Sequence, residues 1–205
     1  MNIELIDKMG SDLSIVNAAR VSFSKIKSQF YDEKDERLIK YLATHNHWSP
    51  FAHASLQFRI KAPIFVARQL VKHQVGLVWN EVSRRYVDYE PEFYIPFLWR
   101  NKAVDKKQGS GKDEIEYDVT DLITQAKQLY SDMIEKGIAP EMARMILPQS
   151  MMTEWIWSGT LYAFARVCQL RNQDDSQQET RMITEQMAKH CRDHFPVSWR
   201  YLNEQ

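Results

Sequence analysis

The stretch from residue 54 to residue 61 alternates strictly between side chains of two kinds. Its even-numbered positions are apolar and its odd-numbered positions are polar. Successive side chains of a strand point to opposite faces, so this pattern predicts a β-strand with one buried face. Pro63 follows at a position that suits the first turn of a helix reaching about His73.

The other periodic segments have helical spacing. We expect helices over residues 35–45, 119–134 and 151–171, a short helix between Pro140 and Pro148, and a last helix from Ser176 toward Phe195. Gly137 suits the end of the second helix, and Ser176 with Glu179 has the spacing of a capping box. With strands early and helices late, the pattern favours an α+β (mixed α/β) fold.

Length and composition are those of one globular domain. A chain of 205 residues with 44% hydrophobic residues can bury a sizeable core, and no internal repeat divides it. We therefore expect a single domain over residues 1–205. The segment 101–116 is charged, contains glycines and has few large apolar residues, so we expect a flexible surface loop there.

The charge balance argues against several classes of partner. The 27 Lys and Arg residues equal the 27 Asp and Glu residues, so no overall field attracts nucleic acid or an anionic membrane. No run of about 18 apolar residues could span a membrane, and the charged N-terminus does not resemble a signal peptide. We expect a cytoplasmic protein, or one in the host cytoplasm if the source is viral. Cys168 and Cys191 are expected to be buried reduced thiols.

A dense group of polar side chains interrupts the apolar sequence between Ser49 and Tyr94. It comprises Arg68, Gln69, Lys72, His73, Asn80, Glu81, Ser83, Arg84 and Arg85. The four cations in this group indicate a site for an anion. No glycine-rich motif has the strand-to-helix context of a Rossmann or P-loop site.

Three later arginines, Arg144, Arg166 and Arg171, have two interpretations. Desolvating an arginine is costly, so each would meet either a carboxylate of the same chain or an anionic ligand. Taken singly, the internal ion pair is favoured; taken with the basic group at 68–85, the ligand gains support. His45 and His47 lack the companion ligands of a metal site, so no metal is expected.

Several separated blocks of the chain follow the order and approximate spacing of one known family. They are AARVSF at 18–23, HNHWSPFAH at 45–53, APIFVARQLVKHQ at 62–74, NEVSRRY at 80–86, EFYIP at 92–96, ARMILP at 143–148 and QLRNQDDSQQE at 169–179. In these blocks the chain resembles the flavin-dependent thymidylate synthases. The resemblance implies a thymidylate synthase-complementing fold, with a central, mostly antiparallel sheet flanked by helices. It also implies a homotetramer with active sites shared between subunits.

The resemblance further implies a reaction and its residues. The family converts dUMP to dTMP with a one-carbon unit from methylenetetrahydrofolate and hydride from FAD, which NADPH recharges; no cysteine nucleophile is needed. Carried over by motif position, the dUMP site comprises Gln69, Lys72, Glu81, Val82, Ser83, Arg84, Arg85, Arg144 and Arg171, with Arg171 catalytic. The FAD site comprises Ser22, His47, Ser49, Lys72, His73, Gln74, Glu81, Thr160, Leu161, Tyr162 and Arg166.

One motif departs from the family pattern. The family has Arg-His-Arg where this chain has Lys72-His73-Gln74, which removes one positive charge and one bidentate fork. This change favours one alternative, a noncatalytic or altered-specificity relative that binds FAD or a nucleotide. A nucleic-acid-binding module and a purely structural helical protein are further alternatives. The balanced charge argues against the first of these, and the joint presence of Gln69 and Arg171 argues against the second.

Overall fold

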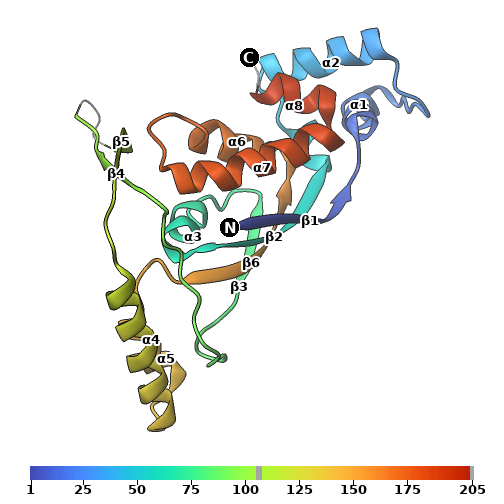
Figure 1. Cartoon of the computed structure of the whole chain (residues 1–205). Coiled ribbons are helices and arrows are strands. Elements are labelled where there is room, and N and C mark those ends of the chain that lie inside the picture. Colours follow the sequence, from blue (N-terminus) through green and yellow to red (C-terminus); the bar gives the residue numbers. More distant parts are fainter. Residues whose placement is uncertain (105–107, 204–205) are drawn as a thin grey trace.

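The computed structural model describes residues 1–104 and 108–203, and its centre is a four-stranded antiparallel sheet (Figure 1). The strand order is β1-β2-β6-β3, with β1 at Asn2–Met9, β2 at Ser55–Pro63, β6 at Met152–Thr160 and β3 at Leu77–Glu81. The central strands β2 and β6 pair along their whole length. The expected α+β fold with an antiparallel central sheet is confirmed.

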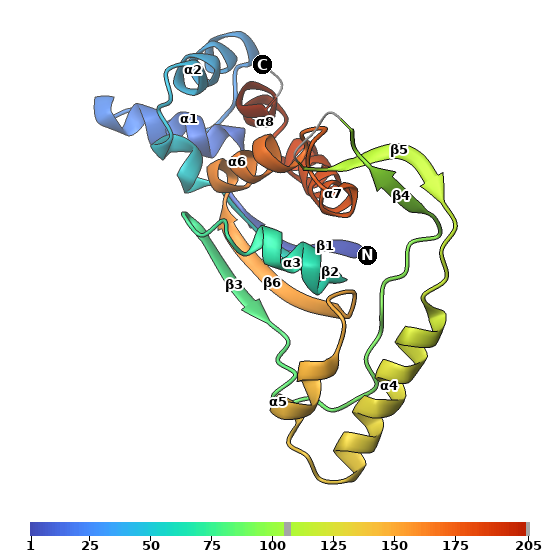
Figure 2. The same cartoon turned by 90° about the vertical axis from the view of Figure 1, so that its left-hand side faces the viewer.

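One face of the sheet packs against α3 (Ile64–Leu70), α6 (Leu161–Arg171) and α7 (Gln178–His194), as Figures 1 and 2 show. The apolar positions of the alternating strand are buried on this face. The Phe58 ring meets Phe164 of α6 edge to face at 5.1 Å, and Phe164 meets Trp157 in the same way at 5.4 Å. An aromatic core therefore joins the sheet to α6.

A helical layer built from both ends of the chain lies beyond one end of the sheet (Figure 2). It contains α1 (Asp12–Arg20), a 3-10 turn at Val21–Phe23, α2 (Asp32–Thr44), a 3-10 turn at Ser49–His53, and α8 (Pro196–Asn203). The Asp12 carboxylate accepts hydrogen bonds from the N–H groups of Val197 at 3.1 Å and Ser198 at 2.9 Å. Since the first N–H groups of a helix lack partners within it, Asp12 caps α8 and ties the chain ends together.

A helical arm extends from the other end of the sheet (Figures 1 and 2). It consists of α4 (Thr120–Glu135), α5 (Pro140–Ala143) and a 3-10 turn at Arg144–Ile146, as the sequence predicted. Gly137 has a φ of +79°, and its N–H donates to the Ile134 carbonyl while that of Ile138 donates to Met133. Gly137 therefore ends α4 in a Schellman motif.

The segment expected to be a loop at 101–116 contains regular structure. The strands β4 (Trp99–Lys102) and β5 (Ser110–Ile115) pair antiparallel, and residues 105–107 of the expected loop lie outside the described residues. The Asn101 amide donates to Asp113 across the pair at 2.7 Å, and the Gln108 amide donates to Asp175 before α7 at 2.8 Å. Polar side-chain hydrogen bonds hold these strands, which lack the alternating apolar pattern by which strands are predicted. The expectation of a loop is therefore wrong for β4 and β5.

The single helix expected over residues 151–171 is also wrong. The first part forms β6, in which Thr153, Trp155 and Trp157 are buried and their neighbours are half-exposed. This period of two is that of a strand. The Thr160 hydroxyl then accepts the Ala163 N–H at 3.1 Å and caps α6, so the helical half of the expectation is correct.

The expected capping box at the start of α7 does not form. Ser176 donates to the Leu170 carbonyl at 3.2 Å, and the Glu179 carboxylate pairs with Arg100 at 2.6 Å. The helix after Pro63 ends at Leu70 rather than near His73. Tertiary partners in these places outweigh the local sequence signals.

We expect Asp12→Ala to lower the free energy of unfolding by about 1–2 kcal/mol, because it removes a cap that accepts two hydrogen bonds. Urea denaturation followed by circular dichroism measures this change. Asp193→Ala is the control, since Asp193 pairs with Lys189 on the surface and its removal should cost at most about 0.5 kcal/mol. Equal losses in the two variants would contradict the capping role.

Candidate functional site

The segment between α3 and β3, which carries the altered motif at 72–74, lies along α6. Toward β3, the Gly76 carbonyl accepts the Thr160 N–H at 3.1 Å, at the start of α6. Gly76 has a φ of +77°, a conformation that favours glycine. Toward α3, His73 contacts Arg171, the last residue of α6. The segment therefore touches both ends of this helix.

Arg171 is held by two acceptors. Its Nε donates to His73 Nε2 at 3.0 Å, and a terminal nitrogen donates to the Gln69 carbonyl at 3.3 Å. His73 can accept this bond only as a neutral imidazole with its proton on Nδ1. Burial lowers the pKa of His73 below its usual value, and the positive charges of Arg171 and Arg166 lower it further. The imidazole is thus neutral at neutral pH and orients the guanidinium.

The cations around His73 have no carboxylate partners. Within residues 1–104 and 108–203, no carboxylate lies within 4.0 Å of the charged groups of Lys72, Arg166 or Arg171, nor of Arg144 on the arm. The internal ion pairs favoured for the single arginines are therefore absent from this part of the chain. Unpaired positive charge next to a neutral histidine suits an anionic ligand.

Gln69 links this group to α7. Its amide nitrogen donates to Gln177 Oε1 at 2.7 Å, and its amide oxygen accepts the Thr180 hydroxyl at 3.2 Å. Both ends of the amide are therefore bonded, which fixes the side chain against the start of α7.

The last residue of β3 and the residue after it carry polar groups already bonded within the chain. The two carboxylate oxygens of Glu81 accept from the Thr153 hydroxyl at 2.8 Å and from the Trp79 indole at 3.1 Å. The Val82 N–H donates to the Glu154 carbonyl at 2.9 Å. These bonds fix where the following turn leaves the sheet.

Two adjacent arginines in this turn point in different directions. Arg85 is exposed beside Ser83, whose hydroxyl accepts the Arg85 N–H at 3.3 Å. Arg84 is 6% exposed; its guanidinium lies 4.4 Å from the Tyr89 ring centroid and 5.7 Å from that of Tyr130 in α4, and it donates to the Tyr89 carbonyl. This geometry gives Arg84 an anchoring role and leaves Ser83 and Arg85 accessible.

Six of the residues predicted to contact FAD lie at the start of α6 or in the N-terminal layer, whereas His73 lies at the other end of α6 and Glu81 at the end of β3. Ser22, His47 and Ser49 are exposed, and the Trp48 ring lies 6.4 Å from Tyr162 of α6. Leu161 differs from this set, because its side chain is fully buried and its N–H donates to the Ala54 carbonyl at 2.8 Å. The structure argues against a side-chain contact from Leu161.

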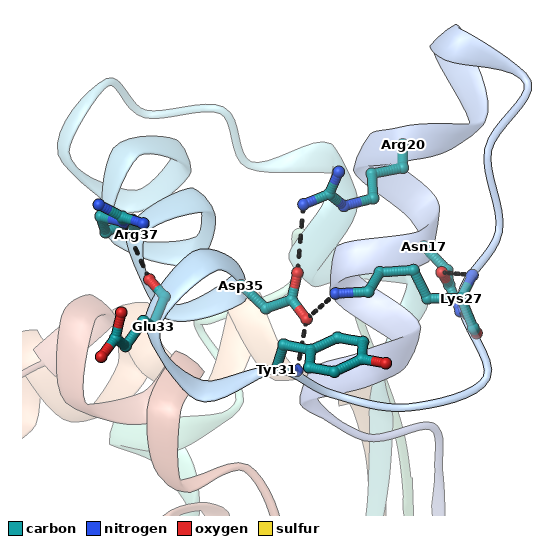
Figure 3. Close-up of polar contacts among 7 residues, drawn as sticks. All are labelled: Asn17, Arg20, Lys27, Tyr31, Glu33, Asp35 and Arg37. Atoms are coloured by element: carbon teal, nitrogen blue, oxygen red, sulfur yellow. Dashed lines mark hydrogen bonds and ion pairs between the residues drawn. The ribbon is translucent and has the colours of Figure 1, made fainter.

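A buried carboxylate fixes the loop that follows Ser22 (Figure 3). Asp35 is fully buried; it accepts from Arg20 at 3.2 Å, from the Tyr31 N–H at 2.7 Å, and from Lys27. The loop borders a cavity of about 930 Å³. Burial acts to raise the pKa of Asp35, but the bonds from Lys27, Tyr31 and Arg20 outweigh it, so the pKa is lowered. Sequence reasoning missed this residue, which lies in an ordinary helical pattern.

Arg144 is not brought to Arg171 within one chain. The turn at Arg144–Ile146 belongs to the arm, whereas α6 lies above the sheet (Figures 1 and 2). Arg144 itself is exposed. The structure thus groups Arg171 with His73 and Gln69, and leaves the arm residue apart.

The cysteines and the possible metal ligands were also located in the described part of the chain. Cys168 and Cys191 are free and buried, and burial raises the pKa of both thiols. No group of three or more His, Cys, Asp or Glu side chains among the described residues could hold a metal ion. Nor is any helix in residues 1–104 and 108–203 long and apolar enough to cross a membrane.

We expect Asp35→Asn to lower the free energy of unfolding by roughly 3 kcal/mol at neutral pH, since it removes one partner of a buried ion pair. The folded-state pKa lies below the usual value of 3.8, so this stabilisation is complete above that pH and is lost as the pH falls through the folded pKa. Urea denaturation between neutral pH and about pH 3 should therefore show the two proteins converging in acid. Glu4→Gln, at an exposed position of β1, is the control; a constant difference across the pH range would contradict the ion-pair explanation.

The chain matches the family described as thymidylate synthase complementing protein over residues 4–197. It is 36% identical to the flavin-dependent thymidylate synthase of Thermus thermophilus, over 98% of this chain and 75% of that protein. Identity to the same enzyme of Thermosipho africanus is 37%, over 95% and 87%. The crystal structure of the UMP/dUMP methylase PolB from Streptomyces cacaoi bound with 5-Br dUMP has a TM-score of 0.85 at 30% identity, over 98% of this chain and 93% of that one. The chain therefore belongs to the thymidylate synthase complementing protein family, together with these flavin-dependent thymidylate synthases.

Proposed function

We propose that this protein converts dUMP to dTMP, with methylenetetrahydrofolate as one-carbon donor, FAD as redox cofactor and NADPH as reductant. The observation that carries the proposal is the arrangement of Arg171, a half-buried cation without a carboxylate partner among the described residues, oriented by neutral His73. The relatives named flavin-dependent thymidylate synthase and the methylase bound with 5-Br dUMP support it.

In this proposal Arg171 acts on the pyrimidine. A fixed guanidinium facing the uracil stabilises negative charge as the N3 proton is lost or the ring becomes enolate-like. The ring carbon that takes the one-carbon unit then becomes more nucleophilic. Because the carbon is activated in this way, the two buried thiols are not needed as nucleophiles.

The residues along α6 fit a flavin dinucleotide. When bound, FAD supplies the hydride-transfer chemistry. Lys72 and Arg166 supply positive charge for its diphosphate, and Gln74 is exposed beside them as a further donor. Ser22, His47 and Ser49 present polar groups from the N-terminal layer. The loss of two arginines from the family motif is thus partly offset by Arg166.

We further propose a single-domain subunit in a homotetramer with shared active sites. Ser83 and Arg85 suit the phosphate of dUMP, with Arg144 as a second clamp. In one chain the arm, which carries Arg144, lies apart from α6, which ends at Arg171 (Figure 2). A site that uses both is complete if the arm of one subunit reaches α6 of another.

An altered-specificity or noncatalytic relative is the second candidate. The altered motif at 72–74 favours it, as does the similar structure of PolB, which is named a UMP/dUMP methylase. Binding of flavin without formation of dTMP, or equal turnover of UMP, would select this candidate.

The main test follows flavin absorbance of the FAD-loaded protein anaerobically while NADPH, dUMP and methylenetetrahydrofolate are added and dTMP is assayed. We expect bleaching by NADPH, recovery as dTMP forms, and a loss of about 10²–10³ in kcat for Arg171→Lys with FAD retained. Arg59→Lys is the control, because Arg59 pairs with Glu154 at an exposed position of the sheet. Wild-type protein that retains flavin yet forms no dTMP would refute the proposed reaction.

The shared site is tested by mixing two inactive variants, Arg144→Ala and Arg171→Ala, under conditions that exchange subunits. If each site takes these residues from different subunits, about a quarter of the sites in a random mixture contain both arginines, and activity returns to that level. If one chain supplies both residues, mixing restores nothing. Arg171→Ala mixed with itself is the baseline.

A further inference from the structure

Two adjoining cavities lie between the β4–β5 hairpin and the start of α7, apart from the residues assigned above to FAD and dUMP. Their volumes are about 330 and 490 Å³, and Arg100 and Ser110 line both. Small-molecule pockets are usually roughly 300–1,000 Å³ in volume. The Arg100 Nε donates to the Ser110 hydroxyl at 2.7 Å, so these residues form the wall between the cavities.

Glu179, which lines the smaller cavity, has one carboxylate oxygen without a donor. Glu179 is 3% exposed; its Oε1 accepts from Arg100 at 2.6 Å and faces the Tyr94 hydroxyl at 3.5 Å. Its Oε2 is buried and has no hydrogen-bond partner. Leaving a buried carboxylate oxygen unsatisfied is costly, so an N–H donor from a ligand would be favoured here.

Aromatic rings line the same cavity. Phe65 and Tyr94 have their ring centroids 6.1 Å apart, and Trp99 lies beside them with its indole N–H bonded to the Tyr117 carbonyl at 2.8 Å. That bond fixes the plane of the indole. Flat rings around an acceptor select a flat heterocycle that carries an N–H group.

The larger cavity carries positive charge. Lys112 and Arg181 line it together with Arg100, and the buried Nε of Arg181 has no hydrogen-bond partner. Glu114 and Asp174 also line it, and Arg181 reaches Asp174 at 3.2 Å; the Asp174 side chain is 93% exposed, so this pair is weak. An unpaired buried N–H donor and a nearby lysine suit a phosphate.

The cavities adjoin the Arg171 group. Gln177, which lines the smaller cavity, accepts from the Gln69 amide at 2.7 Å, and the Gln69 carbonyl accepts from Arg171. The hairpin is fixed above them, since Gln108 bonds to Asp175 at 2.8 Å.

We propose that these cavities bind an aminopurine nucleotide, with the amino group of the base on Glu179 Oε2 and a phosphate on Arg181 and Lys112. Adenine carries the exocyclic amino group that a buried acceptor requires, and a phosphate on its ribose would reach the adjoining cations. In assigning a source, the inference rests on the proposed function: NADPH is the aminopurine nucleotide that the reaction consumes, so its adenosine 2′-phosphate half is the expected ligand.

Calorimetry with adenosine 2′,5′-bisphosphate tests this on the FAD-loaded protein. We expect Glu179→Gln to weaken binding roughly tenfold, because the amide replaces an acceptor with a donor, and Lys112→Ala to weaken it roughly fivefold. Lys102→Ala, an exposed lysine of the same hairpin outside both cavities, is the matched control. Lys112→Ala keeps the pair between Glu179 and Arg100, so it tests the site even if Glu179→Gln unfolds the hairpin.

Binding that both substitutions weaken, that Lys102→Ala leaves unchanged and that excess dUMP does not displace would support the site. Absence of binding, displacement by dUMP, or equal effects of Lys112→Ala and Lys102→Ala would overturn it. AMP binding as tightly as the bisphosphate would overturn the assignment to NADPH. The measurement needs no turnover: bisphosphate binding without dTMP formation would count against the proposed function only, and dTMP formation without bisphosphate binding would count against this site only.

Discussion

The pairing of β2 with β6 is the constraint on which the rest of the structure depends. Its register places Phe58 opposite Trp157, on the face covered by α6. A shift by one residue would turn these side chains to the other face and remove the aromatic core. The same pairing also determines where the segments around Arg171 and His73 lie. Because the strands are antiparallel, α3 leaves β2 at one end and α6 leaves β6 at the other, and the segment from α3 to β3 must run back along α6 until Gly76 meets Thr160.

The second constraint is electrostatic. The chain has as many acidic as basic side chains, so carboxylates were available to neutralise the arginines near His73. They are placed elsewhere: Asp35 holds Arg20 and Lys27, and Glu179 holds Arg100. Ionisable side chains with shifted pKa values and no partner within the protein are typical of functional sites. The neutral state of His73 follows from this placement, since a protonated imidazole would add a further charge to an already positive group and could not accept the bond from Arg171.

The sequence predicted those helices and strands in which the spacing of apolar residues matches the side chains that are buried. β2, α2, α4 and α7 were found to within a few residues of their ends. The prediction was wrong where neighbouring sequence or polar hydrogen bonds obscured this spacing. β6 was taken as part of a helix because its aromatic residues precede a true helical segment, and β4 and β5 are held by polar bonds that no hydrophobic pattern reports. An anion site at 68–85 and a catalytic role of Arg171 were predicted from the cations and the family motifs, and both stay predictions. The inward turn of Arg84 depends on the position of Tyr130, some 45 residues later in the chain, which local sequence does not specify.

Arg84 also connects two parts of the proposed site. By stacking on Tyr130, it ties the turn that presents Ser83 and Arg85 to α4, which packs against the 3-10 turn carrying Arg144. The three residues suited to bind phosphate are therefore attached to one rigid unit at the arm end of the sheet. Arg171 and His73 belong to another unit, fixed by α6. The arm and α6 lie apart in a single chain (Figures 1 and 2), and this separation is the reason why the proposed nucleotide site draws its residues from more than one subunit.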